Sequence, residues 1–302
     1  MKLMKTNILQ ISNVSKRFSG VVALDNVSFN VQQGDVHALV GENGAGKSTL
    51  IKIISGVYVL DAGSIIYEGG ELKNVNPTGC IRMGISTVHQ ELRMVEALSV
   101  AENIFLGEPI ESRSAVGKVV NWDKLYNESQ KLIDSMGIQI DPRQRISELS
   151  VAKKQIIEIC KAVRRDAKLI IMDEPSATLT ENELELLFKI IRDLKKRNIT
   201  IIYISHRLEE IFQIADKVTI MRDGKHIITD DVQNLTRNKV IAHMVGREIE
   251  DIYPKKQTPS EKVLLEVTGI ERQGVLHDIH FTLHEGEILG IAGLVGSGRT
   301  EL

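Results

Sequence analysis

The sequence predicts an α/β fold built on a mainly parallel sheet, followed by the beginning of a second domain of the same kind. Three observations lead to this prediction. Short runs of β-branched and apolar residues alternate with helical patterns through most of the chain. A glycine-rich loop joins one predicted strand to a helix, and the last thirty residues repeat the pattern of residues 21–50.

Hydrophobic periodicity predicts the individual elements. Apolar runs bounded by polar or glycine residues predict strands at 8–14, 27–31, 36–40, 85–88, 169–172, 199–205 and 218–222. Apolar residues spaced three and four apart predict helices at 47–55, 125–136, 150–164, 181–197 and 208–215. The segment from about 98 to 146 reads as mostly helical and without strands, so we expect a helical insertion in the sheet domain.

A domain boundary is predicted near residue 250. Residues 251–262 read DIYPKKQTPSEK, a polar stretch with two prolines that is typical of a linker. When residues 21–50 are aligned with 273–302 at a constant offset of 252, seven of thirty positions are identical. We therefore expect residues 1–250 to form a first domain and residues 263–302 to begin a homologous second one, in which the chain stops early.

Composition restricts the possible partners and the cellular location. Charged residues make up 26 % of the chain and the net charge is −2, so no overall basic field attracts nucleic acid. The two cysteines, Cys80 and Cys160, lie far apart, which argues against a disulfide framework or zinc site and favours the cytosol. No signal peptide and no run of 18 apolar residues is found, so we expect any membrane association to be peripheral.

The glycine-rich loop has the full pattern of a phosphate-binding loop. It consists of Gly41, Glu42, Asn43, Gly44, Ala45, Gly46, Lys47, Ser48 and Thr49. It follows a predicted strand and precedes a helix, so its backbone N–H groups and the helix N-terminus would surround the β- and γ-phosphates of ATP. Lys47 would add a positive charge, and the Ser48 hydroxyl would bind Mg²⁺. The alternative is a glycine turn that only caps a helix.

Two acidic residues follow the buried strand predicted at 169–172. The carboxyl edge of a parallel sheet is its usual ligand-binding edge, so we expect Asp173 to hold Mg²⁺ there through water. Pleat alternation would aim Glu174 differently, toward the water that attacks the γ-phosphate, which gives it the role of general base. Alternatively, the pair is an acidic N-cap of the next helix.

Two further polar residues follow predicted strands. His206 ends the run ITIIYISH, where a neutral imidazole would hydrogen-bond the γ-phosphate, although a lone histidine there is more often structural. Gln90 follows the strand predicted at 85–88 and would offer its amide oxygen to Mg²⁺ or to the attacking water. A loop glutamine without a function is an equally good reading of Gln90 in isolation.

Taken in order, these elements resemble the nucleotide-binding domains of ABC ATPases, over residues 8–229. GENGAGKST resembles the Walker A motif, LIIMDEP the Walker B strand, Gln90 the Q-loop and His206 the switch histidine. The segment ELSVAKKQ stands where the family has its LSGGQ signature, so Ser150 would contact ATP bound by the opposite domain. The resemblance implies a P-loop NTPase fold with a mixed sheet, an antiparallel β subdomain and a helical subdomain at about 92–165.

The resemblance also suggests how the adenine is bound. Phe18, in SKRF, stands where the family has an aromatic side chain that stacks on the adenine. Such stacking is worth about 1–3 kcal/mol per base and selects weakly among bases. The alternative is that Phe18 is a core residue at a strand end.

The context of these motifs is similar to the double-domain ATPases of bacterial monosaccharide importers. The similar segments are DEPSATLT, VHQEL and GIAGLVGSGRTEL. This resemblance implies an ATPase at the cytoplasmic face of the membrane, bound to two transmembrane permease subunits near Gln90 and the helical insertion. Apolar residues around 92–95 are candidates for that contact, and the alternative is that they pack internally. It also implies an indirect link to an extracytoplasmic sugar-binding protein, and head-to-tail pairing of the chain's own two nucleotide-binding domains. Nucleic acid is not among the implied partners.

Two departures from the family pattern affect one composite site. Val151 and Ala152 replace the two glycines of the signature, which keeps the backbone farther from phosphate, and Arg299 replaces the lysine of the second loop. We therefore expect that site to be weakly active or inactive, with hydrolysis at the site of Lys47.

Two other classes of function remain as alternatives. A soluble double-domain ABC ATPase would carry a long charged helical linker, which residues 251–262 are not. A regulatory nucleotide-binding module without turnover would not need both Glu174 and His206.

Overall fold

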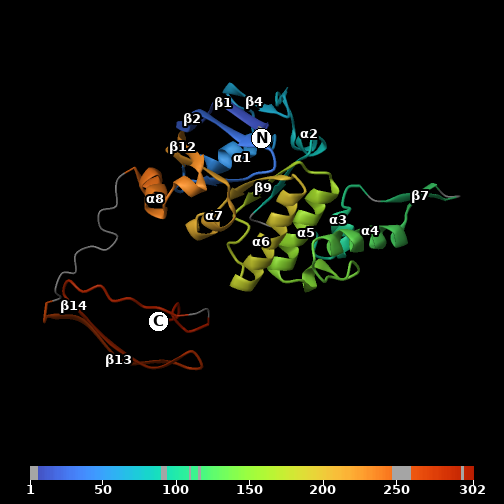
Figure 1. Cartoon of the computed structure of the whole chain (residues 1–302). Coiled ribbons are helices and arrows are strands. Elements are labelled where there is room, and N and C mark those ends of the chain that lie inside the picture. Colours follow the sequence, from blue (N-terminus) through green and yellow to red (C-terminus); the bar gives the residue numbers. More distant parts are fainter. Residues whose placement is uncertain (1–5, 90–93, 109, 115–116, 247–259, 294–295) are drawn as a thin grey trace. The chain divides into compact units, whose positions relative to one another are not determined.

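The chain divides into two compact units, Met1–Glu248 and Ile249–Leu302, which are described separately (Figure 1). The computed structural model describes residues 6–89, 94–108, 110–114, 117–246, 260–293 and 296–302.

The first unit is built around a mixed sheet in which, among the described residues, six strands pair in the order β12-β11-β3-β10-β9-β6. The strands are β3 (Val36–Val40), β6 (Ile85–Val88), β9 (Leu169–Asp173), β10 (Thr200–Ile204), β11 (Lys217–Arg222) and β12 (Lys225–Asp231). Neighbouring strands run parallel except β12, which pairs antiparallel with β11. In this order β3 lies between β11 and β10, and the phosphate loop follows β3. Asp173 ends β9, which lies on the far side of β10, at the same carboxyl edge of the sheet.

A second, antiparallel sheet has the strand order β2-β1-β4-β5. Its strands are β1 (Asn7–Phe18), β2 (Val21–Gln32), β4 (Ala62–Tyr67) and β5 (Gly70–Glu71). The first helix after the phosphate loop, α1 (Lys47–Ile54), packs in one hydrophobic core with this sheet and with one face of the mixed sheet. Buried Leu9 of β1, Leu50 of α1 and Leu39 of β3 all belong to this core.

The opposite face of the mixed sheet packs against helices, because side chains alternate along a buried strand. Ala38 and Val40 flank Leu39 and belong to this other core, with Ile157 and Ile191 from helices α5 and α6. A valine or isoleucine side chain of this kind contributes about 1.5–3 kcal/mol when fully buried. The helices concerned include α3 (Val100–Ile104), α4 (Trp122–Ser135), α5 (Val151–Arg164), α6 (Glu181–Lys196) and α7 (Leu208–Ile214). Figure 1 shows α5 and α6 side by side below β9.

All the strands and helices predicted from periodicity are present, and the predicted fold class is confirmed. The expectation that residues 98–146 lack strands is wrong. Strands β7 (Glu111–Ser114) and β8 (Gly117–Val120) form an antiparallel hairpin within that segment. Each has four residues, too few to produce a strong alternating pattern, and among the described residues they pair only with each other. The remaining elements are α2 (Pro77–Arg82), α8 (Arg237–Val245) and two 3₁₀ turns, η1 (Ile146–Glu148) and η2 (Val232–Asn234).

The second unit contains a hairpin of β13 (Val263–Arg272) and β14 (Leu276–His284). Its backbone repeats that of the β1–β2 hairpin and the phosphate loop at the offset of 252 found in the sequence. Positive φ angles recur at Asn26 and Asp278, with 52° and 49°, and at the paired glycines 34 and 286, 44 and 296, and 46 and 298. The internal repeat is thus present in the backbone as well as in the sequence. Several apolar side chains of this unit are exposed, Ile288 to 89 %.

Candidate functional site

The phosphate loop has a backbone that requires glycine. Gly44 and Gly46 have φ angles of 86° and 95°, and Gly46 is the N-cap of α1. A Cβ atom at position 46 would lie 2.6 Å from the Ala23 carbonyl oxygen and 2.8 Å from Leu24 Cδ2. A side chain at position 41 would collide with the Met221 carbonyl oxygen. The loop therefore packs tightly against β2 and β11, which fixes its curvature before any ligand binds.

Lys47, the first residue of α1, points its ammonium group back into the loop. Its Nζ donates hydrogen bonds to the carbonyl oxygens of Gly41, at 2.7 Å, and Glu42, at 3.0 Å. Burial lowers the pKa of Lys47, whereas the nearby Glu174 and Asp173 carboxylates act in the opposite direction. The ammonium is thus held by loop carbonyls in the position where a phosphate would compete for it.

The loop forms the floor of a pocket of about 280 Å³. Its lining brings together the loop, the start of β2 and the carboxyl ends of β9 and β10. The lining residues are Val21, Val22, Ala23, Asn43, Gly44, Ala45, Gly46, Lys47, Ser48, Thr49, Asp173, Glu174 and Ile204. The structure therefore places the predicted phosphate loop and the predicted acidic pair around one space.

Asp173 and Glu174 reach this pocket in different ways. Asp173 is the last residue of β9 and pairs with Ile204 of β10. Burial and the neighbouring Glu174 raise the pKa of Asp173, while Lys47 opposes the shift. Glu174 follows the strand with a φ of +48°, and its backbone N–H donates to the Ile204 carbonyl at 3.0 Å. The expectation that pleat alternation aims Glu174 is therefore wrong, because a left-handed backbone sets its direction.

His206 lies beside Glu174. The distance from His206 Nδ1 to Glu174 Oε1 is 3.4 Å, and the side chains are 63 % and 24 % exposed. The fold thus brings together two residues that are 32 positions apart in the sequence, because β9 and β10 are adjacent. Gln90 lies outside the described residues.

Phe18 stands at the end of β1, where it pairs with Val21 of the pocket lining. Its ring is 41 % exposed, so the alternative that Phe18 is a core residue is wrong. The ring meets Tyr58 edge to face with centroids 5.2 Å apart, and Lys16 Nζ lies 5.5 Å from its centroid. An exposed aromatic ring held from one side presents a surface on which a base could stack.

The signature segment contributes no residue to the pocket lining. Ser150 is the exposed N-cap of α5, and its hydroxyl accepts a hydrogen bond from the Lys153 N–H at 3.4 Å. Val151 is 48 % exposed and Ala152 is buried at 5 %. Contact of Ser150 with a nucleotide would thus require a second domain, as the sequence resemblance implies.

Comparison with known proteins identifies the family. Residues 24–177, just over half of the chain, match the family model described as ABC transporter. The chain belongs to the ABC transporter family. A crystal structure of MJ1267, an ATP-binding cassette of an ABC transporter in its ADP conformation, superposes with a TM-score of 0.68 at 27 % identity. That match covers 80 % of this chain and 100 % of the other.

Curated ABC relatives are closer in sequence. The xylose import ATP-binding protein XylG of Geobacillus kaustophilus is 46 % identical over 99 % of this chain and 60 % of its own length. The galactose/methyl galactoside import ATP-binding protein MglA of Escherichia coli is 47 % identical over 98 % of this chain and 58 % of its own. The chain therefore spans about 60 % of the length of these relatives. None of the described helices is long and apolar enough to cross a membrane.

The second glycine-rich loop of this ABC protein has a similar internal contact. Arg299 Nη1 donates to the Gly293 carbonyl at 3.3 Å, which matches the bond from Lys47 to Gly41 at the offset of 252. A Cβ atom at Gly298 would lie 2.9 Å from Leu276 Cδ2, as one at Gly46 would approach Leu24. The geometry of the loop is thus repeated, but a guanidinium replaces the ammonium.

Sequence reasoning missed several residues of this ABC site. Val21, Val22 and Ala23 line the pocket, although nothing in their apolar character indicates it. Glu210 is 2 % exposed and accepts hydrogen bonds behind the Glu174 and His206 segments. In the sequence it is one of two adjacent glutamates on an amphipathic helix, and no local signal distinguishes the buried one.

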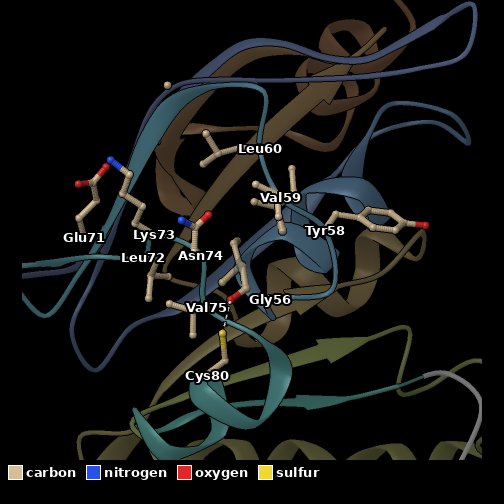
Figure 2. Close-up of a pocket in the computed structure, with 13 residues that line it drawn as sticks. Gly56, Tyr58, Val59, Leu60, Glu71, Leu72, Lys73, Asn74, Val75 and Cys80 are labelled. Carbon is tan, nitrogen blue, oxygen red and sulfur yellow. Dashed lines mark hydrogen bonds between the residues drawn. The ribbon is translucent and has the colours of Figure 1, made fainter.

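A second pocket, of about 220 Å³, lies between the end of α1, β5 and α2 (Figure 2). The buried Cys80 thiol donates to the Ile54 carbonyl at 3.5 Å beside it, and burial raises the pKa of this thiol. The charged residues of its lining, Glu71 and Lys73, are exposed. Lys47, Ser48, Asp173 and Glu174 line the other pocket, and His206 is next to Glu174 without being part of that lining.

Proposed function

We propose that this chain binds Mg-ATP at residues 41–49 and hydrolyses it as the ATP-binding subunit of an importer for a monosaccharide. The observation that carries the proposal is the pocket in which Lys47, Asp173 and Glu174 surround one space, with His206 3.4 Å from Glu174. Family membership and the import proteins among the relatives support the same conclusion.

The geometry of the loop supports phosphate binding. Gly44 and Gly46 have positive φ, and residues 43–49 with the N-terminus of α1 line the pocket; a glycine-rich loop that opens a helix favours anions. Lys47 would exchange its two carbonyl acceptors for phosphate oxygens, which form stronger charge-assisted hydrogen bonds. The exposed ring of Phe18 would stack on the adenine.

The acidic pair fits a divalent cation. Burial and mutual repulsion raise the pKa of Asp173, and a cation at this carboxylate would relieve both effects. Ser48, Asp173 and Gln90 would hold the Mg²⁺, which when bound offsets negative charge on the phosphate oxygens. Glu174 would accept the proton of the attacking water, and His206 would hydrogen-bond the γ-phosphate beside it.

The transport role rests on the relatives. Their names describe import ATP-binding proteins for xylose and for galactose or methyl galactoside, which favours transport over a soluble ABC ATPase. The proposed partners are two transmembrane permease subunits and, indirectly, an extracytoplasmic sugar-binding protein. We place the subunit peripherally at the cytoplasmic face of the membrane, with residues 1–250 and 263–302 belonging to two nucleotide-binding domains that pair head to tail.

The two nucleotide sites of such a pair would differ. In the composite site formed by the second loop and the first signature, Arg299 replaces lysine and Val151 and Ala152 replace glycines. A planar guanidinium does not reproduce a compact ammonium charge. We propose that this site holds nucleotide with little turnover and that hydrolysis takes place at Lys47 and Glu174.

Phosphate release by the complete protein tests the proposed hydrolysis. We expect Glu174→Gln to lower the rate at least about 100-fold, the contribution of a positioned general base, while Mg-ATP binding persists. Glu181→Gln, an exposed residue of α6, is the matched control and should retain the wild-type rate. A Glu174→Gln protein as active as the wild type would remove Glu174 from the reaction.

A further inference from the structure

A buried carboxylate lies behind the proposed hydrolytic site. Glu210, on α7, is 2 % exposed, and within the described part of the chain its Oε2 accepts hydrogen bonds from three hydroxyl groups. The donors are Ser176 at 2.7 Å, Tyr203 at 2.8 Å and Ser205 at 2.8 Å. Its other oxygen lies 3.1 Å from Arg207 Nη1. These three donors satisfy the hydrogen-bonding capacity of an acidic oxygen that is buried to this degree.

The hydroxyl donors come from the two segments that carry the site. Ser176 is two residues after Glu174, and Ser205 immediately precedes His206. Tyr203, from β10, is fully buried, and burial followed by the charge of Glu210 raises its pKa, so its hydroxyl remains a donor. One carboxylate oxygen therefore ties the turn after β9 to the end of β10.

The turn that contains Glu174 needs such a tie. Its φ of +48° is unusual for a residue with a side chain, and backbone of this kind costs about 1–3 kcal/mol unless its surroundings hold it. On one side the Glu174 N–H bonds to the Ile204 carbonyl at 3.0 Å. On the other side the Ser176 hydroxyl bonds to Glu210 at 2.7 Å.

We propose that Glu210 is a positioning residue that fixes Glu174 and His206 relative to one another and thereby sets the rate of hydrolysis. Glu210 is absent from the lining of the nucleotide pocket, so it acts through the two segments and not through the ligand. The inference rests on the proposed function and adds to it a residue that neither the motifs nor the pocket identifies.

The negative charge of Glu210, and not only its shape, is required for this role. Glutamine has the same size, but one of its two terminal atoms is an NH₂ donor. If the NH₂ group faces Ser176, Tyr203 and Ser205, a hydrogen-bond donor replaces the oxygen that accepts from these three hydroxyls. If it faces Arg207, two donor groups meet, and the hydroxyls bond to a neutral oxygen that accepts more weakly.

Steady-state ATP hydrolysis by the complete protein tests the proposal. We expect Glu210→Gln to lower kcat on the order of 10- to 100-fold, the size of effect that a small misplacement of a reacting group produces. The KM and Kd for Mg-ATP should change less than about two-fold, because the phosphate loop is untouched. Glu209→Gln, exposed on the same helix, is the matched control and should keep the wild-type kcat.

A double variant separates positioning from general destabilisation. If Glu210 acts through Glu174, the Glu174→Gln, Glu210→Gln protein should turn over within about two-fold of Glu174→Gln. The proposal would be contradicted if Glu210→Gln lowered kcat by the same factor in the Glu174→Gln protein as in the wild type. An unchanged kcat in Glu210→Gln, or a kcat loss accompanied by an equal loss of Mg-ATP affinity, would also contradict it.

Ser176→Ala provides the test if Glu210→Gln fails to fold. It removes only the hydroxyl that ties the Glu174 turn to Glu210, and we expect a lower kcat with unchanged Mg-ATP affinity. A wild-type kcat in Ser176→Ala would contradict the proposal. Failure of the proposed function would look different, since the wild-type protein itself would then release no phosphate.

Discussion

At the scale of single residues, the pocket contains two neighbouring carboxylates, Asp173 and Glu174, whose negative charges repel each other. Asp173 is partly buried next to Glu174, and both effects raise its pKa, while Lys47 only partly offsets them. The folded chain therefore binds a proton at Asp173 more tightly than the unfolded chain does. The stability linked to this group is complete at low pH and is lost as the pH rises through the folded pKa.

It follows that Asp173→Asn, which removes a carboxylate whose ionised form the fold disfavours, should be more stable than the wild type at pH 7. We expect the Tm to rise by about 1–3 °C, which corresponds to a stability gain below about 1 kcal/mol, while Mg²⁺-dependent ATP turnover is lost. Calorimetry without nucleotide measures the first effect and phosphate release the second. A lower Tm would show that the charge is favourable in the fold.

His37, in β3 just before the phosphate loop, predicts a different pH dependence. The ring is buried, its Nε2 is 2.7 Å from Thr219 Oγ1, and burial, followed by the charge of Lys217, lowers its pKa from 6.5 to about 3. The fold thus requires neutral His37. The resulting stability is present above pH 6.5 and is lost as the pH falls toward about 3.

Urea unfolding at pH 7 and pH 5 measures this dependence. We expect the wild type to lose free energy of unfolding by up to about 1.4 kcal/mol per pH unit below pH 6.5 through this one group. His37→Gln, which does not titrate, should have a flatter pH profile even if its stability at pH 7 is lower. Parallel profiles for the two proteins would show that the fold does not lower the pKa of His37.

At the scale of elements, the connection from β3 to α1 was the most predictable part of the site. The sequence marks it with three glycines, one lysine and two hydroxyl residues at fixed spacing, and the structure gives the glycines and the lysine a physical reason. Gly44 and Gly46 both have positive φ, but an added Cβ meets nothing within 4 Å at Gly44 and collides with β2 at Gly46.

This difference makes the two glycines a matched pair. Gly44→Ala should lower the free energy of unfolding by about 1–2 kcal/mol, because a residue with a side chain is strained in a left-handed backbone. Gly46→Ala should lower the free energy of unfolding further, because its Cβ atom would also overlap with the Ala23 carbonyl oxygen. It should weaken Mg-ATP binding as well. Denaturant unfolding and nucleotide titration of both variants check this order, which equal losses would contradict.

Elements were predictable where burial imposes one pattern and unpredictable where it does not. Strands β3 and β6 are buried or nearly so and have the predicted bounds, because continuous apolar runs end at polar residues. Strand β12 is half-exposed at one edge of the mixed sheet, and the short β7–β8 hairpin carries little periodicity, so neither was predicted. The direction of Glu174 was also beyond the sequence, because tertiary hydrogen bonds maintain its positive φ.

At the scale of the whole molecule, the repeat is the feature with the largest consequence. Asn26 and Asp278 share a positive φ, as do the glycine pairs 44 and 296, and 46 and 298, so the two units use the same local geometry at these positions. The chemistry differs at several loop positions, among them the cation, where Lys47 corresponds to Arg299. On the proposed function, the two nucleotide sites would be asymmetric, because a similar backbone carries an ammonium in one loop and a guanidinium in the other.

ATP hydrolysis by single variants of the complete protein measures the asymmetry. We expect Lys47→Ala to lose at least about 100-fold in turnover, since the ammonium stabilises charge on the transferred phosphoryl group. Arg299→Ala should retain most of the wild-type rate. The opposite pattern, with Lys47→Ala active and Arg299→Ala inactive, would place hydrolysis at the second loop.

The most direct test of the central claim is a structure of the complete protein with Mg²⁺ and a non-hydrolysable ATP analogue. We predict the triphosphate within residues 41–49, the Lys47 ammonium moved from the Gly41 carbonyl to a phosphate oxygen, and Asp173 and Glu174 facing the terminal phosphate. An empty first loop at saturating nucleotide, or Lys47 still bonded to Gly41 with nucleotide bound elsewhere, would contradict the account.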